Sequence, residues 1–308
     1  MGNLWDPERT IEPTLALKLI DEQFPELEAK QIREMGIGWD NTAFIVDDKL
    51  IFRFPRRQIA VNLLEEEWFF LPKLASRLPL SIPNPQWKGV PTTQFPWSFT
   101  GYPLLIGCTA CHNNLSEEAR NELAQPIALF LKKLHSLPIQ EFPRDPSKSH
   151  HSRIDGNLIN EKIKINFNEL EKLELLENRN HLETIVADSQ NFKEPTTSAI
   201  VHGDLYVRHL LIDESKQLAG IIDWGSVHIG DPANDIAIAH TFLPEAAHKT
   251  FRETYGKIHQ NTWQLSRLRA ILSGTYLILF GHYTKDSKIK REGFRTLKVL
   301  AETAYKIL

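Results

Sequence analysis

The sequence predicts an α+β fold in two parts, a β-rich N-terminal part followed by a larger helical part. Over about the first 100 residues, short runs rich in β-branched and aromatic residues alternate with turn residues. From Leu115 onward, apolar residues recur at helical spacing instead. A chain of 308 residues is long enough to form two lobes with separate cores. We therefore expect an antiparallel sheet with a helix in residues 1–104 and a mainly helical lobe in residues 105–308.

The N-terminal part begins with a helix and continues as strands. Pro13 suits the first turn of a helix, and apolar residues follow it at helical spacing up to Phe24. Alternation of apolar and polar residues then predicts strands at Gln31–Met35, Thr42–Val46 and Leu50–Phe54.

Turn residues connect these strands. The stretch from Gly36 to Asn41 reads "GIGWDN" and predicts a glycine-bearing hairpin tip, and the Asp47-Asp48 pair predicts a tight turn. A helix is expected at Ala60–Ala75. The proline-rich stretch after it predicts loop and edge strand, because proline cannot donate to a sheet ladder. "SFTGYPLLIG" predicts one more strand.

The second part is predicted to be mostly helical. Ser116 is a candidate N-cap, and Pro126 is expected to kink the following helix or start it anew. A polar loop with two adjacent histidines, "PRDPSKSHHSRIDGN", precedes charged amphipathic helices at about Glu161 to Ala187. The end of the chain, from Ile236, is again helical in pattern and holds 12 Lys/Arg against 5 Asp/Glu.

Composition narrows the class of protein. The net charge of −3 gives no reason to expect a nucleic-acid partner, and no apolar run reaches the length of a membrane span. The first residues show no signal-peptide pattern, so we expect a cytoplasmic protein, and we expect a monomer. Cys108 and Cys111 could form half of a zinc site, but no second pair completes it; we interpret them as two incidental thiols.

Polar residues concentrate in one short segment, "VHGDLYVRHLLID" at Val201–Asp213. Three interpretations compete for it: a metal site, a catalytic loop and an ordinary turn. Asp204 and Asp223 are expected at the ends of neighbouring short strands. Burial of two carboxylates without a cation costs several kcal/mol each, as an order of magnitude. A divalent metal or a cationic substrate group would remove this cost.

Together with the segments around it, this stretch resembles a known family. "VHGDLYVRHLLID…GIIDWGSVHIGDPANDIA" resembles the catalytic segment of the aminoglycoside phosphotransferase family, relatives of choline kinase and the protein kinases. The segments "MGIGWDNTAFIVDDKLIFRFPRR", "LLEEEWFFLPKLA" and "FTGYPLLIG" precede it in the family's order. The resemblance implies a bilobal protein-kinase-like fold, with the nucleotide-binding lobe first.

The resemblance implies phosphoryl transfer from ATP or GTP to a small hydroxyl-bearing acceptor. In the family's His-x-Asp loop, Asp204 and His202 would be the catalytic residues: Asp204 would orient the acceptor hydroxyl and take its proton, and His202 would brace the loop rather than react. Asp223 would hold Mg²⁺. Asp231 and Asp235 are interpreted as structural, through capping and loop bracing.

The resemblance also implies a nucleotide site in the N-terminal lobe. Arg53 would contact the phosphates, paired with Glu67 on the following helix. The hairpin tip would cover the phosphates, and the segment after the last strand would form the hinge against the base. The tip residues are Gly36, Gly38 and Asn41, and the hinge residues are Tyr102, Leu104 and Leu105.

Two positions depart from the family's pattern. Arg53 stands where such kinases have lysine, which keeps the charge but changes its shape. His209 stands where asparagine is expected, and imidazole is a poor ligand for Mg²⁺. His209 would therefore bind through water, favour Mn²⁺, or leave Asp223 as the main ligand. This substitution is similar to the macrolide phosphotransferase branch and, with the basic C-terminal helices, favours a macrolide over an aminoglycoside.

Three functions remain as hypotheses. The first is an O-kinase of an antibiotic, or of a metabolite such as choline or a sugar. The second is a nucleotide-binding pseudokinase that regulates a partner. The third is a metal-dependent hydrolase that uses His202, Asp204 and His209, a function that would leave the hairpin and Arg53 without a purpose.

Overall fold

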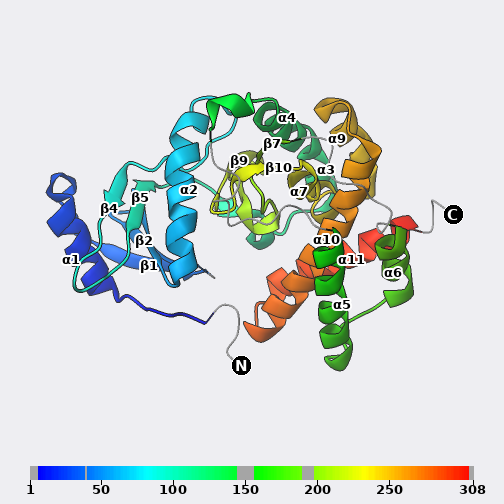
Figure 1. Ribbon diagram of the computed structural model, residues 1–308, viewed down its shortest axis with the longest axis horizontal. Coiled ribbons are helices and arrows are strands. Elements are labelled where there is room, and N and C mark those ends of the chain that lie inside the picture. The colour runs from blue at the N-terminus through cyan, green and yellow to red at the C-terminus, as the bar shows by residue number, and fades with distance from the viewer. Residues whose placement is uncertain (1–5, 39, 144–155, 189–197, 305–308) are drawn as a thin grey trace. The chain divides into compact units, whose positions relative to one another are not determined.

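The chain forms two compact units, which a computed structural model describes for residues 6–38, 40–143, 156–188 and 198–304. Unit 1 comprises residues 1–77, 81–106 and 223–227, and unit 2 comprises residues 78–80, 107–222 and 228–308. Unit 1 combines a sheet with helices, and helices dominate unit 2, which confirms the predicted α+β class (Figure 1). The functional lobes 1–104 and 105–308 stay a prediction, because the units are defined by packing alone.

A five-stranded antiparallel sheet forms the centre of unit 1 (Figure 1). In spatial order its strands are β1 (Ile32–Ile37), β2 (Asn41–Val46), β3 (Leu50–Pro55), β5 (Phe99–Pro103) and β4 (Trp87–Gly89). The short β4 lies at the edge, where the proline-rich stretch predicted an edge strand. β1 extends two residues beyond its predicted end, because Ile37 still pairs with Thr42 of β2.

The connection between β2 and β3 is the tight turn that the sequence predicted. Asp47 and Asp48 have φ angles of 49° and 53°, so both lie in the left-handed region that a type I′ turn requires. The Asp47 carboxylate also accepts a hydrogen bond from the Gln31 N–H at 2.8 Å. Local hydrogen bonding of this kind lets aspartate occupy a conformation that otherwise favours glycine.

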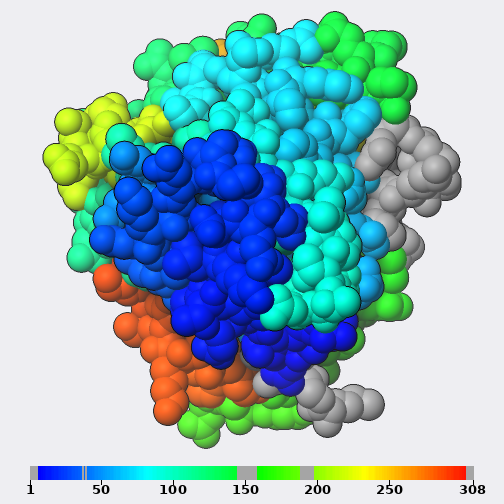
Figure 2. Space-filling view, turned by 90° about the vertical axis from the view of Figure 1, so that its left-hand side faces the viewer, coloured from blue at the N-terminus to red at the C-terminus, as the bar shows by residue number. Residues whose placement is uncertain are grey.

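Aromatic side chains fill the core of unit 1. The rings of Phe54 and Phe99 stack with centroids 4.4 Å apart. A Cβ atom added to Gly101 would lie 2.4 Å from the Phe52 ring, so the sheet accepts only glycine at this position. Two helices flank the sheet, α1 (Pro13–Gln23) and α2 (Gln58–Leu74), and a short 3₁₀ turn, η1, follows α1 at Pro25–Leu27. The outer face of α1 is visible in Figure 2.

Unit 2 contains two small sheets. β7 (Ala199–Val201) pairs with β10 (His228–Gly230), and β8 (Leu210–Ile212) pairs with both β6 (Cys108–Thr109) and β9 (Leu218–Ile221). The sequence-based expectation that the strands before Asp204 and Asp223 are neighbours was wrong, because β7 and β9 belong to different sheets. β10 has only three residues and shows no apolar alternation, so no local pattern indicated it as the partner of β7.

Most of the other described residues of unit 2 lie in helices. Ser116 caps the first of them, accepting a hydrogen bond from the Ala119 N–H at 3.2 Å, and a new helix begins just before Pro126, as predicted. The helices are α3 (Glu117–Glu122), α4 (Ala124–His135), α5 (Gly156–Lys172), α6 (Arg179–Asp188), α7 (Ala233–Ile236), α8 (Ile238–Thr241), α9 (His248–Tyr255), α10 (Gln260–Tyr283) and α11 (Ser287–Ala304). Short 3₁₀ turns lie at η2 (Ala110–His112), η3 (Ile139–Glu141), η6 (Val207–His209) and η7 (Glu245–Ala247). The polar loop expected after Pro143 falls largely on residues 144–155, outside the described residues.

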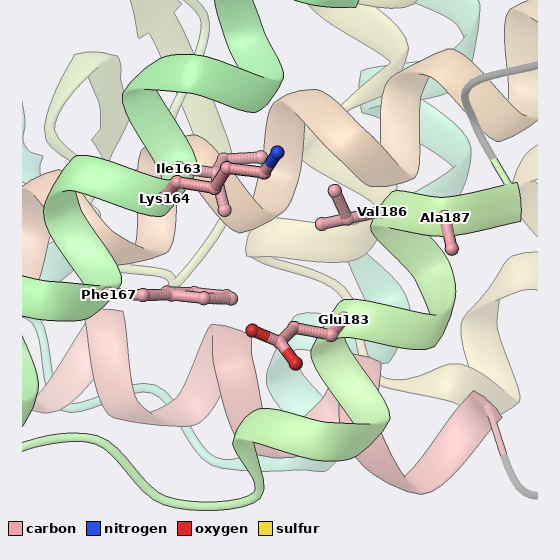
Figure 3. Close-up of a pocket in the computed structure, with 6 residues that line it drawn as sticks. All are labelled: Ile163, Lys164, Phe167, Glu183, Val186 and Ala187. Atoms are coloured by element: carbon pink, nitrogen blue, oxygen red, sulfur yellow. The ribbon is translucent and has the colours of Figure 1, made fainter.

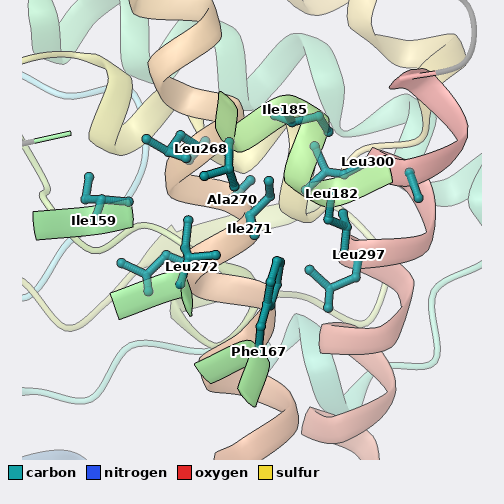
Figure 4. Packing of buried hydrophobic residues seen from close by; sticks show 14 of the residues in the cluster. Ile159, Phe167, Leu182, Ile185, Leu268, Ala270, Ile271, Leu272, Leu297 and Leu300 are labelled. Atoms are coloured by element: carbon teal, nitrogen blue, oxygen red, sulfur yellow. The ribbon is translucent and has the colours of Figure 1, made fainter. Parts of the chain in front are cut away.

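Helix α10 forms the centre of the apolar core of unit 2. Figure 4 shows its Leu268, Ile271 and Leu272 among apolar side chains of α5, α6 and α11. α10 and α11 approach closely, since a Cβ atom added to Gly293 would lie 2.7 Å from the carbonyl oxygen of Gly274. No described helix combines the length and the apolar character that a membrane crossing requires.

A small pocket opens between α5 and α6 (Figure 3). None of its lining residues belongs to the segments that carry the predicted chemistry. They are Ile163, Lys164, Phe167, Glu183, Val186 and Ala187.

Candidate active site

A buried ion pair lies in unit 1 at the position that the sequence predicted. Arg53 on β3 donates two hydrogen bonds to the Glu67 carboxylate on α2, at 2.7 and 2.9 Å. The Glu67 side chain is 0% exposed and that of Arg53 is 10% exposed. Burial alone lowers the pKa of Arg53, but Glu67, Tyr102 and Asp223 together raise it above its ordinary value. Arg53 is therefore a fixed positive charge.

Asp223 lies beside this pair, in the segment of unit 1 that directly follows β9 in the sequence. Its carboxylate accepts a hydrogen bond from Arg53 at 3.3 Å and is 51% exposed. The φ angle of Asp223 is 64°, a left-handed conformation that aspartate tolerates better than most residues. Unusual backbone of this kind concentrates at functional sites. The arrangement leaves a half-exposed carboxylate next to a fixed cation.

The hairpin tip between β1 and β2 is held by several contacts within unit 1. The Gly38 N–H donates to the Asn41 carbonyl at 2.9 Å, and Arg56 donates to the Gly38 carbonyl at 2.6 Å. Arg57 pairs with Asp40. The Asn41 side-chain oxygen is buried without a hydrogen-bond partner among the described residues. A Cβ added to Gly36 would meet nothing within 4 Å, so open space lies beside it.

The predicted hinge residues lie at the end of β5. Tyr102 is buried and pairs with Ile51 of β3, and burial raises its pKa to about 12. The Leu104 N–H donates to the Lys49 carbonyl at 2.8 Å. Leu104 packs with Ile45, Ile51 and Tyr102 in a small apolar cluster that is separate from the aromatic core. Leu105 is half-buried.

In unit 2, the loop from His202 to His209 is held by a buried carboxylate. Asp235 accepts hydrogen bonds from the N–H groups of His202 at 2.8 Å and Gly203 at 2.9 Å. Burial raises its pKa, but hydrogen bonds and the proximity of His135 outweigh burial and hold the pKa below its ordinary value. Asp235 therefore braces the loop, as expected. Gly203 has a φ angle of 84°, so glycine suits this turn.

A chain of hydrogen bonds continues behind Asp235. His135 lies with Nε2 2.9 Å from the Asp235 carboxylate and Nδ1 2.8 Å from the Tyr255 hydroxyl. Burial raises the pKa of Tyr255 above its ordinary value, so its hydroxyl stays protonated and can donate to His135. Asp231 accepts a hydrogen bond from the Ala233 N–H at 2.7 Å and so caps α7, as expected.

The two histidines of the loop have different surroundings. His202 is fully buried, its Nε2 donates to the Ile222 carbonyl at 3.0 Å, and burial lowers its pKa, which favours the neutral ring. This position supports bracing, and its catalytic assignment stays a prediction. His209 donates from Nδ1 to the Asp204 carbonyl at 2.8 Å. A neutral ring with this proton on Nδ1 carries its lone pair on Nε2, as in metal-binding histidines.

Asp204 is the exposed carboxylate of the loop. Its side chain is 43% exposed, and its Oδ1 atom lies 3.6 Å from the Arg269 guanidinium on α10. Sequence reasoning missed both Arg269 and His135. Each stands close to other polar or charged residues of its helix, Arg269 near Arg267 and His135 near Lys133, a pattern that also describes many solvated positions, so neither carried a distinctive signal.

The structure groups the predicted residues within each unit. Arg53, Glu67 and Asp223 meet in unit 1, whereas His202, Asp204 and His209 share one loop of unit 2. The described part of the chain contains no group of three or more His, Cys, Asp or Glu residues suited to hold a metal by itself. Mg²⁺ held together with a nucleotide needs only one or two protein carboxylates, and Asp223 provides the oxygen donor that it prefers. Both cysteines are free thiols, Cys108 exposed and Cys111 buried.

Comparison with solved structures identifies the fold of this chain. The GDP complex of wild-type aminoglycoside 2'-phosphotransferase-IIIa matches with a TM-score of 0.69 and 24% identity, over 97% of this chain and 100% of that one. Macrolide 2'-phosphotransferase from Brachybacterium faecium, an apoenzyme, matches with a TM-score of 0.59 and 18% identity, over 92% and 97%. These similarities show a kinase-like phosphotransferase fold.

The family follows from the sequence. A family model described as "Phosphotransferase enzyme family" matches residues 31–271, well over half of the 308 residues. The chain belongs to this family and is a phosphotransferase. A relative of similar extent is the uncharacterized protein YcbJ of Bacillus subtilis (strain 168), which is 23% identical over 250 residues, covering 77% of this chain and 78% of that protein.

Proposed function

We propose that the enzyme transfers the γ-phosphoryl group of ATP or GTP to a hydroxyl group of a small molecule, an antibiotic of the macrolide or aminoglycoside type. The observation that carries the proposal is the half-exposed Asp223 carboxylate beside the buried Arg53–Glu67 pair. A fixed cation and an oxygen donor side by side suit a triphosphate and its metal ion.

The nucleotide site is built from unit 1. Arg53, held by Glu67, contacts the phosphates, and the backbone of Gly36, Gly38 and Asn41 covers them. The open space beside Gly36 supports this role for the hairpin tip. The apolar cluster around Tyr102 and Leu104 offers a surface for the base, with Leu105 beside it in the chain.

The metal ion belongs with the nucleotide. Asp223 would hold Mg²⁺ through its carboxylate. His209 would bind the metal through water, favour Mn²⁺, or leave Asp223 as the main ligand. A bound metal would supply positive charge to neutralise the phosphate oxygens.

Asp204 acts on the acceptor. Its carboxylate accepts a hydrogen bond from the acceptor hydroxyl and takes the proton while the hydroxyl oxygen bonds to the γ-phosphorus. The bond from that phosphorus to the nucleoside diphosphate breaks in the same displacement. Asp235 and His202 keep the loop in place, so Asp204 needs no large rearrangement.

The other inferences rest on the sequence. We place the enzyme in the cytoplasm as a monomer, with a nucleotide and a small acceptor as partners and neither nucleic acid nor membrane. Its two unpaired cysteines and near-neutral charge support this view.

A screen of macrolides, aminoglycosides, aminosugars and choline with labelled ATP and GTP tests the proposal. We expect transfer of label to an antibiotic hydroxyl. Transfer to choline or a sugar alone would identify a metabolite kinase. Nucleotide binding without transfer to any acceptor would indicate a pseudokinase and contradict the proposal.

A further inference from the structure

One face of α10 differs from the rest of this helix. From Leu268 to Gly281, ten residues are buried and four are half-buried: Arg269, Ser273, Tyr276 and Phe280. Their spacings of four, three and four residues place them on one face of the helix. We call these four residues the α10 stripe.

Two contacts place the α10 stripe along the loop from His202 to His209, within unit 2. At one end, Arg269 lies 3.6 Å from the Asp204 carboxylate. At the other end, the Arg208 guanidinium lies 5.2 Å from the centre of the Phe280 ring. Tyr276 lies near enough to Arg269 for that charge to lower its pKa, although burial has the larger effect and raises it. The stripe thus runs beside the carboxylate that acts on the acceptor.

The charge of this surface is unusual for a site that would bind a polycation. Helix α10, which the structure describes in full, contains no Asp or Glu and two arginines, Arg267 and Arg269. The loop contributes one carboxylate, Asp204, and one arginine, Arg208. Arg269 already pairs with Asp204. An ammonium group brought to Asp204 therefore meets a positive charge next to the only carboxylate of these two segments.

We propose that the α10 stripe binds the acceptor and that Arg269 determines its class: a hydroxyl compound with an apolar body and at most one positive charge. The Tyr276 and Phe280 rings bury the apolar body, and Arg269 disfavours ammonium groups near the reacting hydroxyl. This inference rests on the proposed function and selects, between the two antibiotic types named there, the macrolide over the aminoglycoside.

Competition between two acceptors tests the inference. Erythromycin carries one amine and kanamycin carries several. We expect the wild-type enzyme to favour erythromycin at least tenfold in kcat/KM. Arg269→Glu should reduce this ratio at least tenfold, and Arg269→Gln should reduce it less. Lys249→Glu is the matched control, because it makes the same charge reversal at a side chain that is 84% exposed on α9, and it should leave the ratio unchanged.

The outcomes separate this inference from the proposed function. A wild-type preference for kanamycin, or an unchanged ratio in folded Arg269→Gln, would overturn the inference. Should neither these two compounds nor any other antibiotic of the screen be phosphorylated, the proposed function fails, and equilibrium binding of erythromycin and kanamycin then tests the stripe by itself. If kanamycin binds the wild-type enzyme as tightly as erythromycin does, the inference is overturned. If kanamycin binds more weakly and Arg269→Gln strengthens its binding, the inference is supported.

Discussion

The acidic residues of the two units are held in different ways. In unit 1, Glu67 is fully buried and is bound by the Arg53 side chain itself. In unit 2, Asp204 is 43% exposed, and a different carboxylate, Asp235, holds its loop through backbone N–H groups. In the proposed function, unit 1 would therefore use one ion pair both as scaffold and as binding group, whereas unit 2 would separate the scaffold from the reactive carboxylate. We therefore expect substitution of Glu67 to lower the free energy of unfolding and substitution of Asp204 to lower catalytic activity.

Asp204→Ala is the most informative test of this comparison, because it should lower activity without lowering stability. Loss of the general base should lower kcat by about 10²–10⁴-fold. The melting temperature should change little, because a half-exposed ion pair contributes at most about 1 kcal/mol. Steady-state kinetics measures kcat, and thermal denaturation measures the melting temperature. Glu214→Ala, an exposed acidic residue of the same unit, should leave both near wild type; turnover retained in Asp204→Ala would refute its role.

Glu67→Ala tests the opposite behaviour in unit 1. Removing the partner leaves Arg53 as a buried unpaired charge, which should lower the free energy of unfolding by about 3–5 kcal/mol. Glu65→Ala is the matched control on the same helix. The Glu65 carboxylate pairs with Lys88 at 2.6 Å at the surface and is 43% exposed, so its loss should cost no more than about 1 kcal/mol. If chemical denaturation shows the same loss of unfolding free energy for Glu67→Ala and Glu65→Ala, the expected difference between the buried and the surface ion pair is contradicted.

Asp223→Asn tests whether the exposed member of the unit 1 group binds the metal. Asparagine tolerates the left-handed backbone, so stability should be nearly unchanged. Nucleotide affinity in Mg²⁺ should fall about tenfold or more, which corresponds to about 1.4 kcal/mol. Asp48→Asn is the control, since Asp48 also has a positive φ and also pairs with an arginine, Arg33. An identical Mg²⁺ titration for Asp223→Asn and wild type would exclude a metal role for Asp223.

The last prediction is that acidic pH lowers the stability of unit 2. Burial lowers the pKa of three histidines of this unit, His202, His240 and His248, and that of His240 most strongly. A lowered pKa means that the unfolded chain binds more protons, so stability is complete above about pH 6.5 and falls as the pH drops below that value. Each such histidine contributes a slope of at most about 1.4 kcal/mol per pH unit.

Urea denaturation between pH 7 and pH 5 measures this slope, and His240→Asn should reduce it. Stability that rises as the pH falls through this range would show that these histidines gain rather than lose interactions on protonation.

Much of the fold was predictable because it depends on local pattern. The Asp47-Asp48 turn, the Ser116 cap and the helix starting near Pro126 follow from the conformational preferences of single residues. The Arg53–Glu67 pair was predictable from the family resemblance, since the charged residues stand at the expected places in a strand and the next helix. The pairing of β7 with β10 was not predictable, because three-residue strands carry too few side chains to specify a partner.

By itself, the sequence determined the division into a strand-containing part and a helical part, the family, and the residues proposed to carry the chemistry, since all of these depend on short-range spacing. Only the tertiary structure decided which buried group holds which loop and which face of α10 lies beside Asp204. Arg269 and Asp204 are far apart in the chain, as are His135 and Asp235. Their contacts depend on how helices pack through apolar side chains that resemble one another, and no local pattern encodes that choice.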